Sequence, residues 1–442
     1  MKRSLFLPLP ALALLALVPT AGARNFFELV NQRFQNGGWG GVRTDTTFQF
    51  NGPLFVFEEP GYFGAKSRLV DDNPNGPTPW ARVLGGYDSN IAGFEAGDGG
   101  WFGGVQVGAS ENFMAGPQNV FLGARARVLQ YDGDIFATGR DGNDSTIVDF
   151  DLRARFNRQF NQSVELTAFY NATIGGTREF GQPYPLPGVN HQDYLLYRPA
   201  SQLVYRFDRA PVNDPGLQLT TALRGILIKG LDNDDRDVQR TEARQSIDSI
   251  VRDDLVVGVE GRFGTNRWDD WDMLDSTSFH LLATGGGRLA NGLQYHAAAG
   301  WEWWSYDDNM IGDRDDFYAE LKISGEVTNE LYVAGGLTYG IDTVRPGRLS
   351  DSADPMSLKA AVTGVWNNGL YSVATLLTYT CFQADLISNA NGHWDRWSAG
   401  INVDREIGAD SRVGFSFEYA GIETHQDNFD DISSTFRWIK DF

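Results

Sequence analysis

The sequence has little of what stabilises or anchors most exported proteins. Cys381 is the only cysteine among 442 residues, so no disulfide can form within the chain. After residue 23, no stretch reaches the roughly 18 to 20 apolar residues that a transmembrane helix needs. Positive charge is also scarce, with 37 lysines and arginines against 57 acidic residues. This deficit argues against a nucleic-acid partner, because phosphates are bound by lysine and arginine. It favours cations near the surface or in a lumen.

Motifs for catalysis or tight metal binding are missing as well. The chain has no Cys/His metal spacing, no His-Glu-x-x-His, no phosphate-binding glycine loop and no nucleophile elbow. Two His-x-Asp pairs, His191 with Asp193 and His425 with Asp427, lie in apparent loops without a recognisable partner set. We therefore expect a protein that is not an enzyme and has no cofactor. A hydrolase built on His425 and Asp427 is the weakest alternative.

The first 23 residues predict a cleavable export signal. Lys2 and Arg3 form a basic region, residues 5–18 are apolar, and Ala21-Gly22-Ala23 is a small-residue cleavage site. Removal of Lys2 and Arg3 leaves 35 basic against 57 acidic residues, so the mature chain carries a formal charge of −22. An exported protein without disulfides must gain its stability elsewhere, and a closed hydrogen-bonded barrel supplies it.

What the sequence has in abundance is a two-residue alternation. In residues 411–425 one face is apolar or aromatic and the other is polar or small, with Val413, Phe415, Phe417 and Tyr419 against Arg412, Gly414, Ser416 and Glu418. The pattern returns well over a dozen times and indicates β-strands whose two faces meet different media. A soluble sandwich also alternates, but aromatic residues near the strand ends favour the girdles of a membrane barrel.

Connections between these strands alternate in length. Short turns fall at residues 291–292, 328–329, 367–369 and 408–410, and longer acidic connections at 306–315, 342–356 and 386–393. Outer-membrane barrels have short turns on one side and long loops on the other. The sequence therefore predicts an all-β fold, a single transmembrane antiparallel up-and-down β-barrel of about 16–18 strands in residues 81–442. A count of eighteen requires a strand near 82–87 and a less distinct strand at 242–251.

The last strand supplies a resemblance. Residues 432–442 place Phe436, Trp438 and the terminal Phe442 on one face, although Lys440 and Ser434 depart from the usual apolar pattern. In its signal, strand pattern and last residue the chain resembles Gram-negative outer-membrane β-barrel proteins, porin-like at the level of the class. The resemblance implies an outer-membrane location and a periplasmic C-terminus. It implies outer-membrane lipids and the barrel-assembly machinery, which reads Phe442, as partners. The oligomeric state stays open, a trimer included.

Residues 24–80 differ from the rest of the chain. They carry an aromatic, glycine- and proline-rich run at 48–57. We expect an N-terminal lead-in or partial plug, with an additional strand pair as the alternative.

The polar face of the predicted strands carries the candidate functional residues. Charges facing hydrocarbon at mid-membrane cost about 2–4 kcal/mol for Arg or Lys, so these residues must face water or pair with each other. For any one of them, pairing across strands is the simpler interpretation. For the whole set we favour a water-filled lumen with a transverse field, because side chains alone cannot fill so wide a barrel. The candidates are Arg125, Arg127, Asp149, Asp151, Arg153, Arg155, Glu165, Arg224, Glu260, Arg262, Glu302 and Glu320, with His296 and Lys322 on the same face.

Acidic loops form a second set, at residues 232–235, 269–272, 307–308, 313–316 and 427–431. Their oxygen atoms suit loosely bound Ca²⁺ or divalent ions that bridge surface lipids. A solvated loop surface is the simpler interpretation.

These features favour a porin-like channel for passive diffusion of small hydrophilic solutes, with some preference for cations. Two alternatives stay open. One is a structural or adhesion barrel with a plugged lumen and acidic surface loops. The other is a substrate-specific transporter, including one for hydrophobic solutes.

Overall fold

The computed structural model describes eighteen stretches of the chain. They are residues 78–89, 100–115, 118–132, 146–161, 163–175, 194–207, 217–230, 238–252, 255–268, 275–289, 293–307, 313–328, 331–341, 356–367, 370–385, 391–408, 411–424 and 428–442. Each stretch contains one β-strand. In order these are β1 Thr78–Asp88, β2 Gly100–Ala115, β3 Gln118–Tyr131, β4 Thr146–Gln159, β5 Val164–Gly175, β6 Tyr194–Phe207, β7 Leu217–Gly230, β8 Val238–Arg252, β9 Leu255–Trp268, β10 Ser276–Arg288, β11 Gln294–Tyr306, β12 Arg314–Glu326, β13 Leu331–Ile341, β14 Met356–Asn367, β15 Tyr371–Asp385, β16 Asn391–Gly408, β17 Ser411–Thr424 and β18 Asn428–Asp441.

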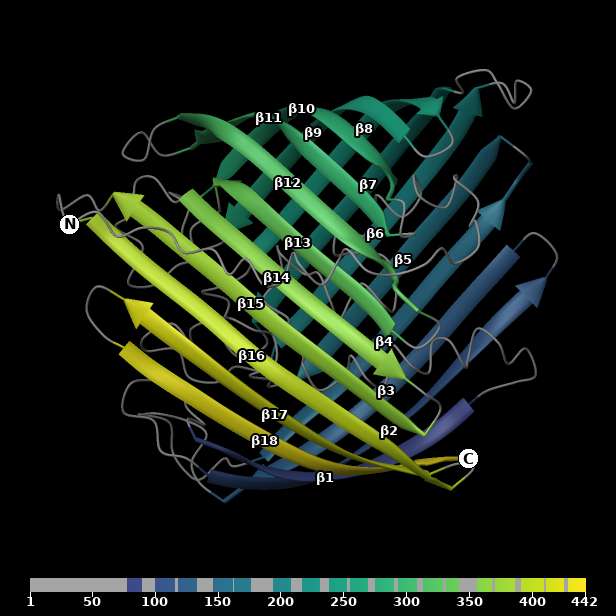
Figure 1. Ribbon diagram of the computed structural model, residues 1–442, viewed down its shortest axis with the longest axis vertical. Coiled ribbons are helices and arrows are strands. Elements are labelled where there is room, and N and C mark those ends of the chain that lie inside the picture. The colour runs from purple at the N-terminus through teal and green to yellow at the C-terminus, as the bar shows by residue number, and fades with distance from the viewer. Residues whose placement is uncertain are drawn as a thin grey trace.

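Strand pairing closes the sheet into a ring. Every strand pairs antiparallel with its neighbour in sequence, from β1 with β2 through β17 with β18. The ring closes where β1 pairs antiparallel with β18, from Trp80 opposite Asp441 to Asp88 opposite Ser433. In Figure 1, β1 and β18 lie side by side at the bottom, and β9 and β10 lie on the opposite side of the ring. Closure removes the free edges that an open sheet would present.

The two faces of this sheet carry apolar and polar side chains in the reverse of the arrangement found in a soluble protein. Large apolar side chains on the outer face are exposed, as for Val259 at 55% and Leu281 at 48%. Side chains on the inner face are buried, and most of them are polar or charged, including Gln106 and Glu302 at 0%. An apolar exterior with a polar interior on a closed sheet is the arrangement of a transmembrane β-barrel.

Aromatic side chains mark the two ends of the outer face. Near the rim opposite the C-terminus the exposed rings include Trp101, Trp301, Trp303 and Trp397, and near the C-terminal rim they include Tyr205, Phe207, Phe415 and Trp438. Some of these rings make polar contacts as well. The indole Nε1 of Trp301 donates to Asp315 at 2.9 Å, and the hydroxyl of Tyr419 donates to Asp430 at 2.8 Å. Rings with one apolar and one polar end suit membrane interfaces.

The structure confirms the predicted fold class, and the strand number is the upper value of the predicted range. The least distinct predicted strand, residues 242–251, lies within β8, and the first described strand begins at Thr78. The expected export signal and most of the expected lead-in lie outside the described residues. No helix among the described residues is long and apolar enough to cross a membrane.

A positional test follows from the outer face of β10. Leu281→Arg places a cation near the middle of the strand, so we expect it to lower the free energy of unfolding by about 2–4 kcal/mol. Thr277→Arg places the same cation on the same face at the strand end, where the expected loss is about 0–1 kcal/mol. Urea titration of barrels folded into lipid vesicles measures both. Equal losses at the two positions would show that hydrocarbon does not cover this face.

Candidate functional site

The structure places the predicted lining residues on the inner face wherever it describes their side chains. Six of the twelve are described, and all are at most 6% exposed, namely Arg125, Arg127, Glu260, Arg262, Glu302 and Glu320. The other six lie in strands, but their side chains fall outside the described part of the chain. Their backbone register still pairs Arg127 with Asp149, Arg125 with Asp151 and Arg224 with Glu242. His296, also predicted on this face, is buried there.

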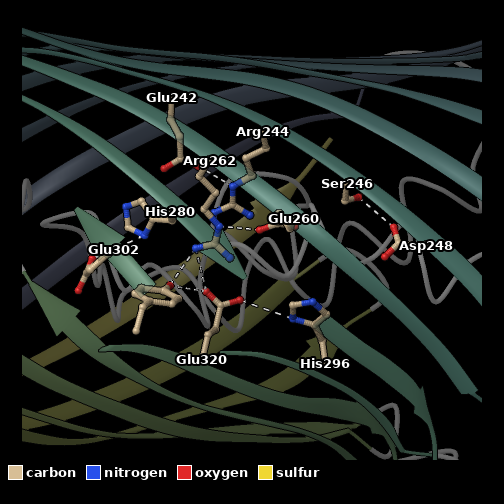
Figure 2. Close-up of polar contacts among 11 residues, drawn as sticks. Glu242, Arg244, Ser246, Asp248, Glu260, Arg262, His280, His296, Glu302 and Glu320 are labelled. Atoms are coloured by element: carbon tan, nitrogen blue, oxygen red, sulfur yellow. Dashed lines mark hydrogen bonds and ion pairs between the residues drawn. The ribbon is translucent and has the colours of Figure 1, made fainter. Parts of the chain in front are cut away.

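A cluster on β8 to β12 brings four of these residues together (Figure 2). We call it the β8–β12 cluster, and it consists of Glu242, Arg244, Ser246, Asp248, Glu260, Arg262, His280, His296, Glu302, Tyr318 and Glu320. Alternation in each strand points these side chains to the same face, which is why residues from five strands meet. Its five carboxyl groups outnumber its two guanidinium groups, so the cluster has an excess of three acidic over basic side chains.

Arg262 lies at the centre of this cluster. Its Nε donates to Glu260 at 2.6 Å, and its Nη1 donates to the Tyr318 hydroxyl at 2.9 Å. That hydroxyl donates to Glu320 at 2.9 Å, and Glu320 also lies 3.7 Å from Arg262 Nη1. The guanidinium carbon lies 5.1 Å from the centre of the Tyr318 ring. Buried charges need such partners, because an unpaired charge loses its hydration without compensation.

Two like charges face each other inside this arrangement. Arg244 on β8 is the direct register partner of Arg262 on β9, and like charges directly opposite each other destabilise a sheet. Each strand compensates with a glutamate two residues earlier on the same face. Glu242 accepts from Nε of Arg244, as Glu260 does from Nε of Arg262. The repeated Glu-x-Arg spacing therefore allows two arginines to lie side by side in a buried wall.

Glu302 joins three strands on the same wall. It is fully buried and accepts hydrogen bonds from the backbone nitrogen of Ile341 on β13 and, at 3.1 Å, from the indole of Trp304. The contact with Ile341 reaches past β12, and it runs close to Gly340, where an added Cβ would meet the Glu302 carboxylate. His280 Nδ1 lies 3.6 Å from the same carboxylate. On the far side of the cluster, His296 Nδ1 lies 3.6 Å from Glu320.

A second set of buried charges surrounds the closure of the ring. We call strands β16–β18 and β1–β3 the closure sector. Asp404 accepts from Nε and Nη2 of Arg437 at 3.1 and 2.9 Å. The strand between them provides Gly414, where a Cβ would collide with both side chains. Nearby, Arg82 donates to Gln106 at 2.6 Å. Among the described buried side chains of this sector, arginine predominates, with Arg82, Arg125, Arg127, Arg412 and Arg437 against Asp404 alone.

The two sets lie on opposite walls. β10 is nine strands from β1 in either direction around a ring of eighteen, and Figure 1 shows the two strands on opposite sides. Among the buried side chains described, the β8–β12 wall has more carboxylates than arginines and the closure sector has more arginines than carboxylates. The described buried charges of the inner surface are therefore separated across the barrel.

Several members of the two sets are absent from the predicted list. Glu242 and Arg244 lie on β8, the strand whose pattern was least distinct. His280 and Arg437 could have been found, because each lies between outward-facing residues, Phe279 and Leu281 for His280 and Phe436 and Trp438 for Arg437. Alternation of residues within each strand would have placed both side chains on the inner face.

Metal and hydrolase sites are not supported by the described residues. Within the described part of the chain, no three His, Cys, Asp or Glu side chains group as metal ligands. The acidic segments at 232–235 and 269–272 lie outside that part, as do both His-x-Asp pairs, so loosely bound Ca²⁺ stays a prediction.

Comparison with known proteins gives a likeness of fold. No family model and no curated protein matches the sequence. Similar solved structures include OpdK of Pseudomonas aeruginosa with vanillate, at 12% identity and a TM-score of 0.44 over 83% of this chain and 99% of that one. OccK9 (OpdG) of the same organism has 10% identity and a TM-score of 0.45 over 84% and 99%. The FrpB iron transporter of Neisseria meningitidis has 9% identity and a TM-score of 0.40 over 81% and 63%. Similarities of this size carry no functional conclusion for this chain.

Replacing the central arginine tests how the cluster is held. Arg262→Met leaves Glu260 and Glu320 buried without their main partner, so we expect a loss of roughly 3–5 kcal/mol in the free energy of unfolding. Arg267→Met is the matched control on the same strand. Arg267 pairs with Asp275 and Asp307 on the outer face at half exposure, and such pairs contribute little. Urea unfolding in vesicles compares the two, and equal losses would contradict the central role of Arg262.

Proposed function

We propose that the protein is a porin-like channel of a Gram-negative-type outer membrane, which passes small hydrophilic solutes by passive diffusion. The observation that carries this proposal is the inverted distribution of side chains on a closed ring of eighteen strands. Barrels of 16 to 18 strands are wide enough to leave an aqueous channel. A polar inner surface is what water and dissolved solutes require.

The separation of charge across the barrel supports the passage of small hydrophilic solutes in particular. Carboxylates on one wall and arginines on the opposite wall produce a field across the lumen. Such a field orients dipolar solutes as they pass and raises the barrier for solutes that cannot align. The acidic excess of the whole chain, −20 at neutral pH, supports a preference for cations over anions at the mouths.

The same surface argues less well for the other functions. A structural or adhesion barrel needs no separation of charge inside its wall, and its partner-binding loops fall outside the described residues. A transporter for hydrophobic solutes needs an apolar path, whereas the described inner wall contains many buried arginines and carboxylates. We propose no enzymatic activity.

Conductance of the purified protein tests the proposal. In planar bilayers bathed in KCl we expect stepwise, ohmic current increases, because a water-filled lumen conducts in proportion to the applied voltage. The K⁺/Cl⁻ permeability ratio from the reversal potential in a salt gradient is expected to exceed one. Heat-unfolded protein at the same concentration is the control and should give no steps.

A folded barrel that gives no steps would refute the channel and favour a plugged structural or adhesion protein. The folded state is checked independently by its faster migration in an unheated electrophoresis sample. A permeability ratio below one, with normal steps, would refute only the preference for cations.

A further inference from the structure

A continuous row of ionisable residues crosses the β8–β12 wall. Successive register partners on five neighbouring strands are Arg244, Arg262, His280, Glu302 and Asp316. Register partners share a face of the sheet, so all five belong to the inner surface. With a strand spacing of about 4.8 Å, the row extends over about 19 Å. Two cations occupy one end, two carboxylates occupy the other, and the imidazole lies between them.

His280 is the one imidazole of the row. An imidazole ordinarily titrates near pH 6.5, so a histidine in a channel wall is a group whose charge can follow pH. Protonation of the imidazole adds one positive charge to the row and to the β8–β12 cluster.

The groups around His280 oppose each other. Arg262 on β9 disfavours a second positive charge, and Glu302 on β11, 3.6 Å from Nδ1, favours it. The ring of Tyr318 on β12 and the ring of Trp304 on β11 also pack against the imidazole. Their centres lie 5.3 Å and 6.1 Å from the centre of the imidazole ring. On β10 itself the same-face neighbours are Ser278 and Leu282, which do not ionise in this range. Among the described residues, Arg262 and Glu302 are thus the cation and the carboxylate next to the imidazole, and the His280 side chain retains 12% exposure.

We propose that His280 determines the ion selectivity of the lumen, so that acidification lowers the permeability of cations relative to anions. This inference rests on the proposed channel function. A permeating ion passes a wall whose charge becomes more positive when His280 gains its proton, and like charges repel. For an ion about 8 Å from the imidazole in an aqueous lumen at about 0.1 M salt, screening leaves an effect of roughly 1.5-fold on each ion, and because K⁺ and Cl⁻ respond in opposite directions the permeability ratio changes by roughly twofold to threefold.

The test measures reversal potentials in planar bilayers under a KCl gradient at pH 8 and pH 5.5. For the unmodified protein we expect the K⁺/Cl⁻ permeability ratio to fall roughly twofold to threefold between the two values. His280→Gln keeps a polar, uncharged side chain, so its ratio should stay near the pH 8 value at both pH values. His280→Lys carries a fixed charge, so its ratio should stay near the pH 5.5 value at both.

A second protein tests whether His280 is sufficient. The chain has five histidines, so replacing His191, His296, His393 and His425 by glutamine leaves His280 alone. This variant should retain most of the pH response, because we expect His296, beside Glu320, to contribute little to it. Electrophoresis of unheated samples confirms that each variant is folded. If the four-residue variant does not fold, the two single substitutions at His280 decide the outcome.

The outcomes separate the two proposals. Normal conductance steps with a pH response that persists in His280→Gln would overturn the role of His280 and leave the channel intact. A response lost in the His280-only protein but present in the unmodified protein would overturn it as well. Absence of steps from every folded protein would refute the channel itself, and the selectivity role with it.

Discussion

The structure depends on one constraint, which is that every backbone polar group of a sheet with an apolar exterior must be hydrogen-bonded within the protein. Hydrocarbon offers no partners for free N–H and C=O groups, and each unsatisfied group costs several kcal/mol. Pairing of β1 with β18 satisfies the last two edges of the ring. That single ladder joins residues about 350 positions apart in the sequence, from Trp80 with Asp441 to Asp88 with Ser433.

Closure of the ring requires charged side chains on the inner face to find partners on the sheet. Because alternate residues face hydrocarbon, the residues between them are confined to the inside and include the buried arginines and carboxylates described above. There they remain charged only with partners on neighbouring strands. Arg262 is an example, since its contacts come from its own strand and from β12, three strands away. The same partners that make the charges tolerable also make the wall a surface with a field, and this connects the stability of the barrel to the function we propose.

Different parts of this structure were accessible from the sequence to different degrees. The faces of β17 and β18 followed from alternation alone, as the exposed Phe415 and Phe436 confirm. β8 was less distinct because Ala243 and Gln245 stand where outward apolar residues would reveal the pattern. The sequence also predicted that Arg125, Glu260 and Glu302 lie on the inner face of the sheet. Their partners were not predicted, because register between strands is determined by turns and by the packing of many pairs together. For His280, alternation within its own strand indicates the inner face, but nothing in that strand indicates that Arg262 and Glu302 are its neighbours.

The sequence by itself determined the medium on each side of the sheet, since a period of two leaves no choice about which side chains share a face. It also determined that the inner surface is polar and that the outer surface carries aromatic rings near its ends. Only the tertiary structure decided how the charges are distributed around the ring. Closure places the arginines near β1 opposite the carboxylates of β8–β12, and register places His280 between Arg262 and Glu302. The physical reason is that electrostatic interactions fall off with distance in space, and neighbours in space across a closed sheet are far apart in the chain.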